Sequence, residues 1–182
     1  MQKRRFNTTG YCNPDWHYTI NPLRNSEDEI NRLIEDKHYF VIHAPRQTGK
    51  TTLLHSFTQK LNHEGRYITL TFSLEEAGYQ SITEKEANST IIHSLYRAAK
   101  VQLPAVYRPG SPEKKTFKNM GHYLSHWSEN MPKPLVLFID EIDSLYDDVL
   151  VSVLRQLRNG FQHRPKNFPS SVGLVGLRDV RD

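Results

Sequence analysis

A short run of residues in the first third of the sequence has the composition of a phosphate-binding loop. Residues 44–51 read APRQTGKT and match the Walker A pattern, with Ala44 in place of the usual first glycine. The run lies between a predicted strand and a predicted helix, whose unsatisfied N–H groups and positive dipole end attract phosphate. Gly49 lets the backbone approach the ligand closely. The predicted phosphate-binding residues are Ala44, Pro45, Arg46, Gln47, Thr48, Gly49, Lys50, Thr51 and Thr52.

Two side chains at the end of this run have predicted roles of their own. Lys50 supplies a mobile positive charge to the β- and γ-phosphates, and the Thr51 hydroxyl is placed to ligate magnesium. The sequence therefore predicts ATP and Mg²⁺ as cofactors. GTP is disfavoured, because no Asn-Lys-x-Asp guanine motif occurs in the sequence.

A pair of acidic residues ends a second apolar run. Residues 135–141 read LVLFIDE, which predicts a buried strand followed by Asp140 and Glu141. Ligands of parallel α/β sheets bind at the carboxyl ends of the strands, so Asp140 is expected to hold magnesium near the phosphates. Glu141 is expected to orient or deprotonate an attacking water, which favours ATP hydrolysis. A structural alternative is solvation of Glu141, and for Asp143 we favour capping of the following helix.

Strands and helices are expected to alternate along the chain. Apolar runs predict strands at 39–42, 135–139 and 172–177, and alternation of Ile68, Leu70 and Phe72 with Tyr67, Thr69 and Thr71 predicts a strand at 66–73. Helical periodicity follows residues 26, 50, 83, 117 and 147, and Gly65 and Phe161 are the expected ends of the second and fifth helices. Ser26 with Glu29 and Thr83 with Glu86 read as capping boxes. This order predicts an α/β fold with a mostly parallel sheet between helical layers.

Composition sets broad limits on the class of protein. The chain has 182 residues, which fits one domain, and its net charge of +4 does not by itself indicate a nucleic-acid surface. The single cysteine, Cys12, cannot form an internal disulfide, which favours a reducing compartment. No secretory signal or membrane-length apolar run is visible, so we expect a cytoplasmic protein with no membrane partner.

Three blocks of sequence resemble the AAA-like and STAND branches of the P-loop ATPases. They are residues 44–54 (APRQTGKTTLL), 135–143 (LVLFIDEID) and 172–182 (VGLVGLRDVRD). The resemblance implies a three-layer P-loop NTPase fold with strand order 5-1-4-3-2. It also implies that Arg178, at the end of the fourth strand, senses the γ-phosphate and assists catalysis with Lys50 and Glu141. Ser73 matches a position at which some relatives hold a polar residue that restrains the catalytic glutamate.

The expected organisation is one P-loop ATPase domain over residues 1–182. Residues 1–38 form an N-terminal segment and helix, and residues 39–182 form the αβα core. The fifth strand and the helical lid of such ATPases have no match here, so we expect a truncated chain whose first strand is at a sheet edge. The predicted function is Mg-dependent ATP hydrolysis by a conformational switch, with a protein partner or self-association. The alternatives are a non-hydrolysing nucleotide-binding interaction module and a DNA-handling ATPase.

Overall fold

A computed structural model describes residues 16, 27–43, 49–79 and 82–176. Four strands alternate with five α-helices and four short 3₁₀ helices, labelled η, within this part of the chain. In chain order the elements are α1 (Glu27–Glu35), β1 (Tyr39–His43), α2 (Lys50–Glu64), β2 (Ile68–Ser73), η1 (Glu75–Ala77), α3 (Glu84–Gln102), η2 (Ala105–Tyr107), α4 (Met120–Glu129), β3 (Leu135–Asp140), η3 (Ile142–Ser144), α5 (Asp147–Gly160), η4 (Phe161–His163) and β4 (Ser171–Gly176).

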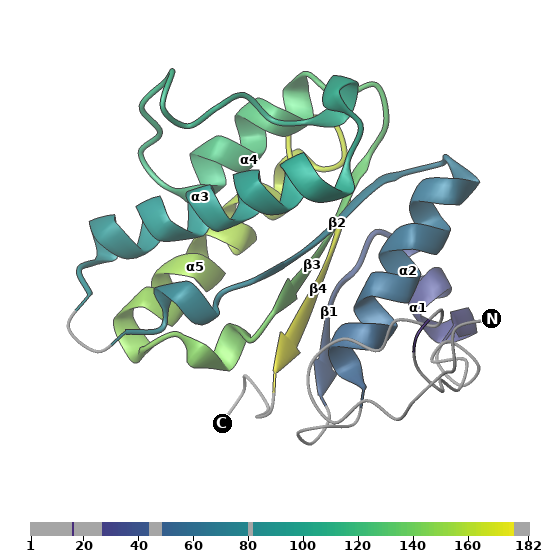
Figure 1. The fold of residues 1–182 in the computed structure, drawn as a ribbon, viewed down its shortest axis with the longest axis horizontal. Coiled ribbons are helices and arrows are strands. Elements are labelled where there is room, and N and C mark those ends of the chain that lie inside the picture. Colours follow the sequence, from purple (N-terminus) through teal and green to yellow (C-terminus); the bar gives the residue numbers. More distant parts are fainter. Residues whose placement is uncertain (1–15, 17–26, 44–48, 80–81, 177–182) are drawn as a thin grey trace.

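The four strands form one parallel sheet in the order β1-β4-β3-β2. The predicted α/β class and the predicted order of these four strands are confirmed. Figure 1 shows α3, α4 and α5 on one face of the sheet and α1 and α2 on the other. All four strands run the same way, so the ends of β2 and β3 that carry Ser73 and Asp140 lie side by side. The sheet thereby brings the loops after these strands to one edge, where a ligand would bind.

A separate apolar cluster holds each helical layer against the sheet. The cluster under α3, α4 and α5 includes the fully buried Trp127, Tyr123 and Phe168, and the cluster under α1 and α2 includes Phe57 and Phe138. Burial of each large apolar side chain contributes roughly 1.5–3 kcal/mol. Strand β3 is buried along its whole length because helices cover both faces. None of the helices that the structure describes is long and apolar enough to cross a lipid bilayer.

The ends of the helices follow the sequence in two cases and depart from it in a third. Gly65 ends α2 in the left-handed conformation with φ 74°, and Thr83 with Glu86 forms a complete capping box at α3, as predicted. The prediction that Asp143 caps α5 was wrong. Residues 142–144 form η3 instead, so α5 begins after Tyr146, whose side chain makes no capping hydrogen bond. The Ser26 capping box lies outside the described residues.

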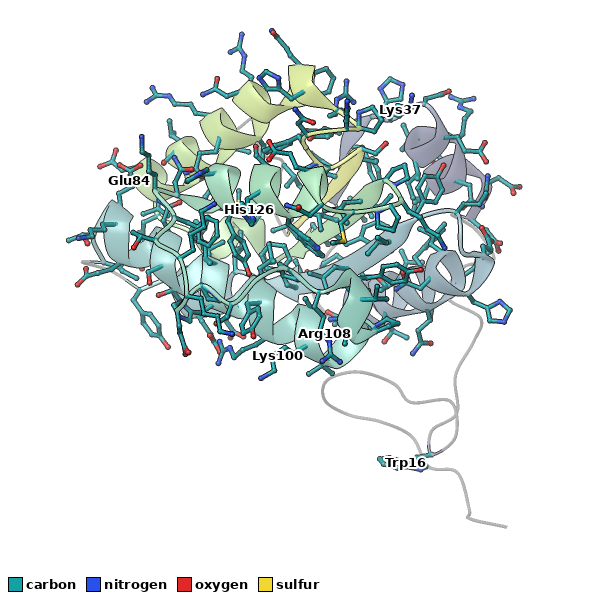
Figure 2. The ribbon with its side chains drawn as sticks, turned by 90° about the horizontal axis from the view of Figure 1, so that it is seen from above. Trp16, Lys37, Glu84, Lys100, Arg108 and His126 are labelled. Carbon is teal, nitrogen blue, oxygen red and sulfur yellow. The ribbon has the colours of Figure 1, made fainter. Side chains whose placement is uncertain are left out.

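Side-chain amides close the outer edge of β2. The Asn62 amide, from the last turn of α2, donates to the carbonyl oxygen of Thr69 (2.8 Å) and accepts from its N–H (2.8 Å). Gln102, at the end of α3, makes the same pair of bonds to the backbone of Thr71, at 2.6 and 3.1 Å. Figure 2 shows Glu84 and Lys100 towards opposite ends of α3, so Gln102 reaches β2 from the Lys100 end. These amides satisfy edge groups that would otherwise be free to pair with another strand.

Replacing Asn62 with alanine is expected to destabilise the domain by about 1–3 kcal/mol, because the backbone N–H and carbonyl groups of the fully buried Thr69 both lose their hydrogen-bond partner. Chemical denaturation of the variant and the wild type measures this difference in the free energy of unfolding. Asn130→Ala is the matched control, since that amide bonds only an exposed carbonyl, and its effect should stay within about 0.5 kcal/mol. Equal effects of the two substitutions would contradict the role given to Asn62.

Candidate nucleotide-binding site

The helix that follows the predicted phosphate loop begins where the motif requires. Gly49 is the N-cap of α2 and has φ 86° and ψ 17°, in the left-handed region. A Cβ atom at this position would meet nothing within 4 Å, so glycine is favoured by the backbone conformation and not by lack of space. The Leu53 N–H donates to the Gly49 carbonyl oxygen at 2.9 Å, which closes the first turn. The N–H groups of this first turn lie at the positive end of the helix dipole, where an anion would bind.

The structure brings together the two motifs that the sequence predicts to share a ligand. The Thr51 hydroxyl, in the first turn of α2, donates to Asp140 Oδ2 at 2.9 Å, across a sequence separation of 89 residues. Asp140 is the last residue of β3, and the N–H of Glu141 donates to its other carboxylate oxygen, Oδ1, at 3.0 Å. Helix α2 and strand β3 therefore place one hydroxyl and one carboxylate side by side.

Burial controls the protonation of Asp140. The side chain lies almost wholly out of solvent, and this burial raises the pKa of its carboxyl group. The hydrogen bonds from Thr51 and from the Glu141 N–H, together with the positive charge of Lys50, lower the same pKa but do not cancel the rise. A buried carboxylate that is only partly compensated attracts a cation, which would supply the missing charge.

The donor set fits magnesium. Mg²⁺ prefers oxygen ligands in octahedral geometry, and it usually takes one or two from the protein and the rest from phosphates and water. The Thr51 hydroxyl and the Asp140 carboxylate are such a pair. Within the described part of the chain, no group of three or more His, Cys, Asp or Glu side chains is arranged to hold a metal.

The stability of the free domain is expected to depend on the ionisation of Asp140. Because its pKa is raised in the folded protein, the folded protein binds this proton more tightly than the unfolded chain does. The contribution of Asp140 to stability should therefore increase as pH falls through the raised pKa. Chemical denaturation of the wild type and of Asp140→Asn over a pH series measures this contribution. The free energy of unfolding of the wild type should rise relative to that of the variant as the pH falls. A relative free energy of unfolding that rises towards alkaline pH would contradict a raised pKa for Asp140.

Glu141 has a strained backbone and a fixed side chain. Its φ of 57° and ψ of 42° place it in the left-handed region, which costs a non-glycine residue about 1–3 kcal/mol. The Ser73 hydroxyl, at the end of β2, donates to Glu141 Oε2 at 2.5 Å. The same hydroxyl accepts a bond from the N–H of Glu75 at 3.0 Å. The contact implied for Ser73 by resemblance is therefore present, and a sequence pattern alone would not find it.

One side chain beside the site was missed by sequence reasoning. His55 lies one helical turn after Thr51 on α2, is about half-buried and lines the same cavity as Thr51 and Asp140. Burial lowers the pKa of its imidazole, and the charge of Asp140 opposes this shift. The i, i+4 spacing from Thr51 is the signal that could have found it.

Several predicted site residues lie outside the described residues. They are Ala44, Pro45, Arg46, Gln47, Thr48 and Arg178. Of the predicted phosphate-binding run, the structure describes Gly49, Lys50, Thr51 and Thr52, all at the start of α2. Their predicted roles stay predictions.

A parallel sheet of this order, with the Walker A sequence before α2 and an acidic pair at the end of β3, is typical of the P-loop NTPase folds. The chain belongs to the AAA domain family, whose family model matches residues 33–182. It is accordingly an AAA-like member of the P-loop ATPases. No protein with a curated description matches the sequence.

Solved structures similar to this one include two of the Drosophila ORC. With the complex bound to poly(dA/dT) DNA and Cdc6, the TM-score is 0.57 and the identity 14%, over 88% of this chain and 25% of that chain. With the complex bound to GC-rich DNA and Cdc6, the TM-score is 0.56 and the identity 13%, over 87% of this chain and 25% of that chain. This chain thus spans about a quarter of the length of each. At these identities the likeness shows a shared fold.

Proposed function

We propose that this domain binds Mg-ATP and hydrolyses it, as a switch between nucleotide states. In this proposal residues 44–52 hold the phosphates, and Thr51 with Asp140 holds magnesium. Lys50 and Arg178 neutralise charge on the γ-phosphate, and Glu141 accepts the proton of the attacking water. Bound magnesium would withdraw charge from the phosphate oxygens.

The observation that carries the proposal is the 2.9 Å hydrogen bond from Thr51 to Asp140. It joins the start of α2 to the end of β3, and a nucleotide on the N–H groups of α2 would have its metal within reach of both side chains. The hydroxyl and the carboxylate satisfy each other in the free domain. Little rearrangement is therefore needed when a cation takes their lone pairs.

The contact between Ser73 and Glu141 supports a switching role. While Glu141 Oε2 accepts the Ser73 hydroxyl, the carboxylate would be held in one orientation and could not turn towards an attacking water. Rotation of either side chain would release it. The domain would thus have a resting and an active arrangement that differ by one short hydrogen bond. Such an arrangement suits a protein partner or self-association that controls turnover.

Replacement of Glu141 with glutamine tests the proposal. Turnover of ATP should fall at least about 100-fold, because general-base catalysis contributes factors of about 10² to 10⁴. Binding of Mg-ATP, followed by calorimetry, should be retained. Glu129→Gln is the matched control, since this exposed glutamate ends α4, and it should leave turnover unchanged.

Other outcomes would point to the alternatives. A wild-type chain that binds Mg-ATP without turnover, alone and with DNA, would be a nucleotide-binding interaction module. Turnover that rises on addition of duplex DNA, with a steep dependence on salt, would indicate a DNA-handling ATPase. Retention of full turnover by Glu141→Gln would overturn the role given to Glu141.

A further inference from the structure

The Ser73 hydroxyl is fixed from two sides, and one of them is the short helix η1. It donates to Glu141 and accepts from the N–H of Glu75, the first residue of η1. The rotamer of Ser73 therefore depends on where the start of η1 lies. Any side chain that fixes η1 also acts on the bond that holds Glu141.

A network on α3 anchors η1. The Glu76 carboxylate accepts a hydrogen bond from Ser94 Oγ at 3.0 Å and forms an ion pair with Arg97. Arg97 Nη2 also donates to Ser94 Oγ at 3.2 Å, so the three groups close a ring. Both charged side chains are more than half exposed, and an isolated pair of this kind would be weak. The shared serine makes it a network with a defined geometry.

The rest of η1 packs against the turn that follows Glu141, so a shift of η1 would move residues of the site. Ala77 is buried, and a Cβ atom on Gly78 would lie 2.7 Å from the Ser144 carbonyl oxygen. The segment after η1 therefore touches η3, the turn that follows Glu141. An open cavity of about 330 Å³ is lined both by Glu76 and Arg97 and by Thr51, Ser73 and Asp140. The network on α3 thus forms part of the wall of the nucleotide site.

We propose that Arg97 is a positioning residue that, through Glu76 and η1, holds Ser73 in the rotamer that restrains Glu141. The inference rests on the proposed function, in which Glu141 activates water. Loss of the Arg97 guanidinium loosens η1, weakens the bond from Ser73 and frees Glu141 for a larger fraction of the time. The expected gain in turnover is modest, about two- to fivefold, because the network is exposed.

Steady-state ATP turnover of five variants tests the proposal. Arg97→Ala should raise kcat about two- to fivefold with KM unchanged, and Ser73→Ala should raise it at least as much. The double variant should match Ser73→Ala alone, because Arg97 acts through Ser73. The exchanged pair Glu76→Arg with Arg97→Glu should return kcat towards the wild-type value. Arg66→Ala, which breaks another exposed ion-paired arginine, should leave it unchanged.

Amide hydrogen exchange gives a second readout that needs no turnover. The Glu75 N–H, which donates to Ser73, should exchange about two- to fivefold faster in Arg97→Ala and at the wild-type rate in Arg66→Ala. An unchanged exchange rate, independent effects of Arg97→Ala and Ser73→Ala on kcat, or no recovery in the exchanged pair would overturn the inference. Full turnover in Glu141→Gln would instead overturn the proposed function.

Discussion

Asp140→Asn is expected to remove magnesium-dependent nucleotide binding while leaving the free domain at least as stable as the wild type. Loss of a charged metal ligand should weaken Mg-ATP binding by about 100-fold or more, since charge on the ligands dominates binding of a hard cation. The free domain should not lose stability, because the substitution removes a buried charge. The wild-type carboxylate is 6% exposed, and its desolvation is not fully compensated.

The hydrogen bonds around residue 140 can survive this substitution. The asparagine oxygen can accept from the Glu141 N–H, as Asp140 Oδ1 does now. The asparagine nitrogen would then face Thr51, and the threonine hydroxyl can reverse its role and accept. No buried polar group is left without a partner, and a buried charge is removed. The unfolding free energy should therefore stay equal or rise by about 1 kcal/mol.

Thermal unfolding with and without Mg-ATP separates the two effects. At a concentration of 100 Kd, ligand stabilises the wild type by about 2.7 kcal/mol, and a 100-fold loss of affinity reduces this to about 0.4 kcal/mol. The variant should therefore melt at or above the wild-type temperature without ligand and show almost no shift with it. Asp148→Asn, in the exposed first turn of α5, should keep the full shift. A ligand-induced shift of wild-type size in Asp140→Asn would remove this residue from the metal site.

The fold class could be predicted because each element is marked locally. Apolar runs mark the strands and period-3.6 patterns mark the helices, and their alternation predicts a parallel sheet. The limits of local patterns show at β2. Alternation along 66–73 suggests that Thr69 and Thr71 face away from the apolar side, yet both are buried, because helices cover both faces of the sheet. The Thr71 hydroxyl is satisfied by the buried Thr58 hydroxyl of α2, at 2.6 Å.

The candidate site was predictable where its residues are adjacent in sequence. Thr51 and Asp140 come from two compact motifs, and only the rule that parallel strands end at one edge was needed to bring them together. The side chains that position the site come from neighbouring helices. Asn62, Gln102 and Arg97 reach β2 and η1 by their length and by the angle at which α2 and α3 pack, and neither quantity can be read from a single sequence.

At the end of α5, a glycine is needed for core packing, and no local sequence pattern indicates this need. Periodicity predicted that the helix continues to Phe161. The helix ends at Gly160 instead, Phe161 is 39% exposed, and Gly160 is buried. A Cβ atom on Gly160 would lie 2.3 Å from three ring carbons of Phe168, which is itself fully buried. The absent side chain is therefore what lets Phe168 fill the core.

Gly160→Ala is expected to destabilise the domain by about 2–3 kcal/mol, as overpacking of a tight core does. The backbone opposes this loss, because Gly160 has helical φ and ψ of −71° and −22° and alanine there would gain about 0.5–1 kcal/mol. The clash outweighs the gain, since a ring closed in on all sides cannot move away without displacing its neighbours. For a chain of this size the melting temperature should fall by roughly 4–12 °C.

Two further variants show whether the contact with Phe168 is the cause. Gly110→Ala adds the same methyl group where nothing lies within 4 Å, and it should change the unfolding free energy by less than about 0.5 kcal/mol. Phe168→Leu removes the ring that the new methyl group would meet. Combined with Gly160→Ala, it should cost less than the sum of the two single changes, because the smaller side chain leaves room for the methyl group. If the two costs simply add, the instability arises from the helix end itself and not from the ring.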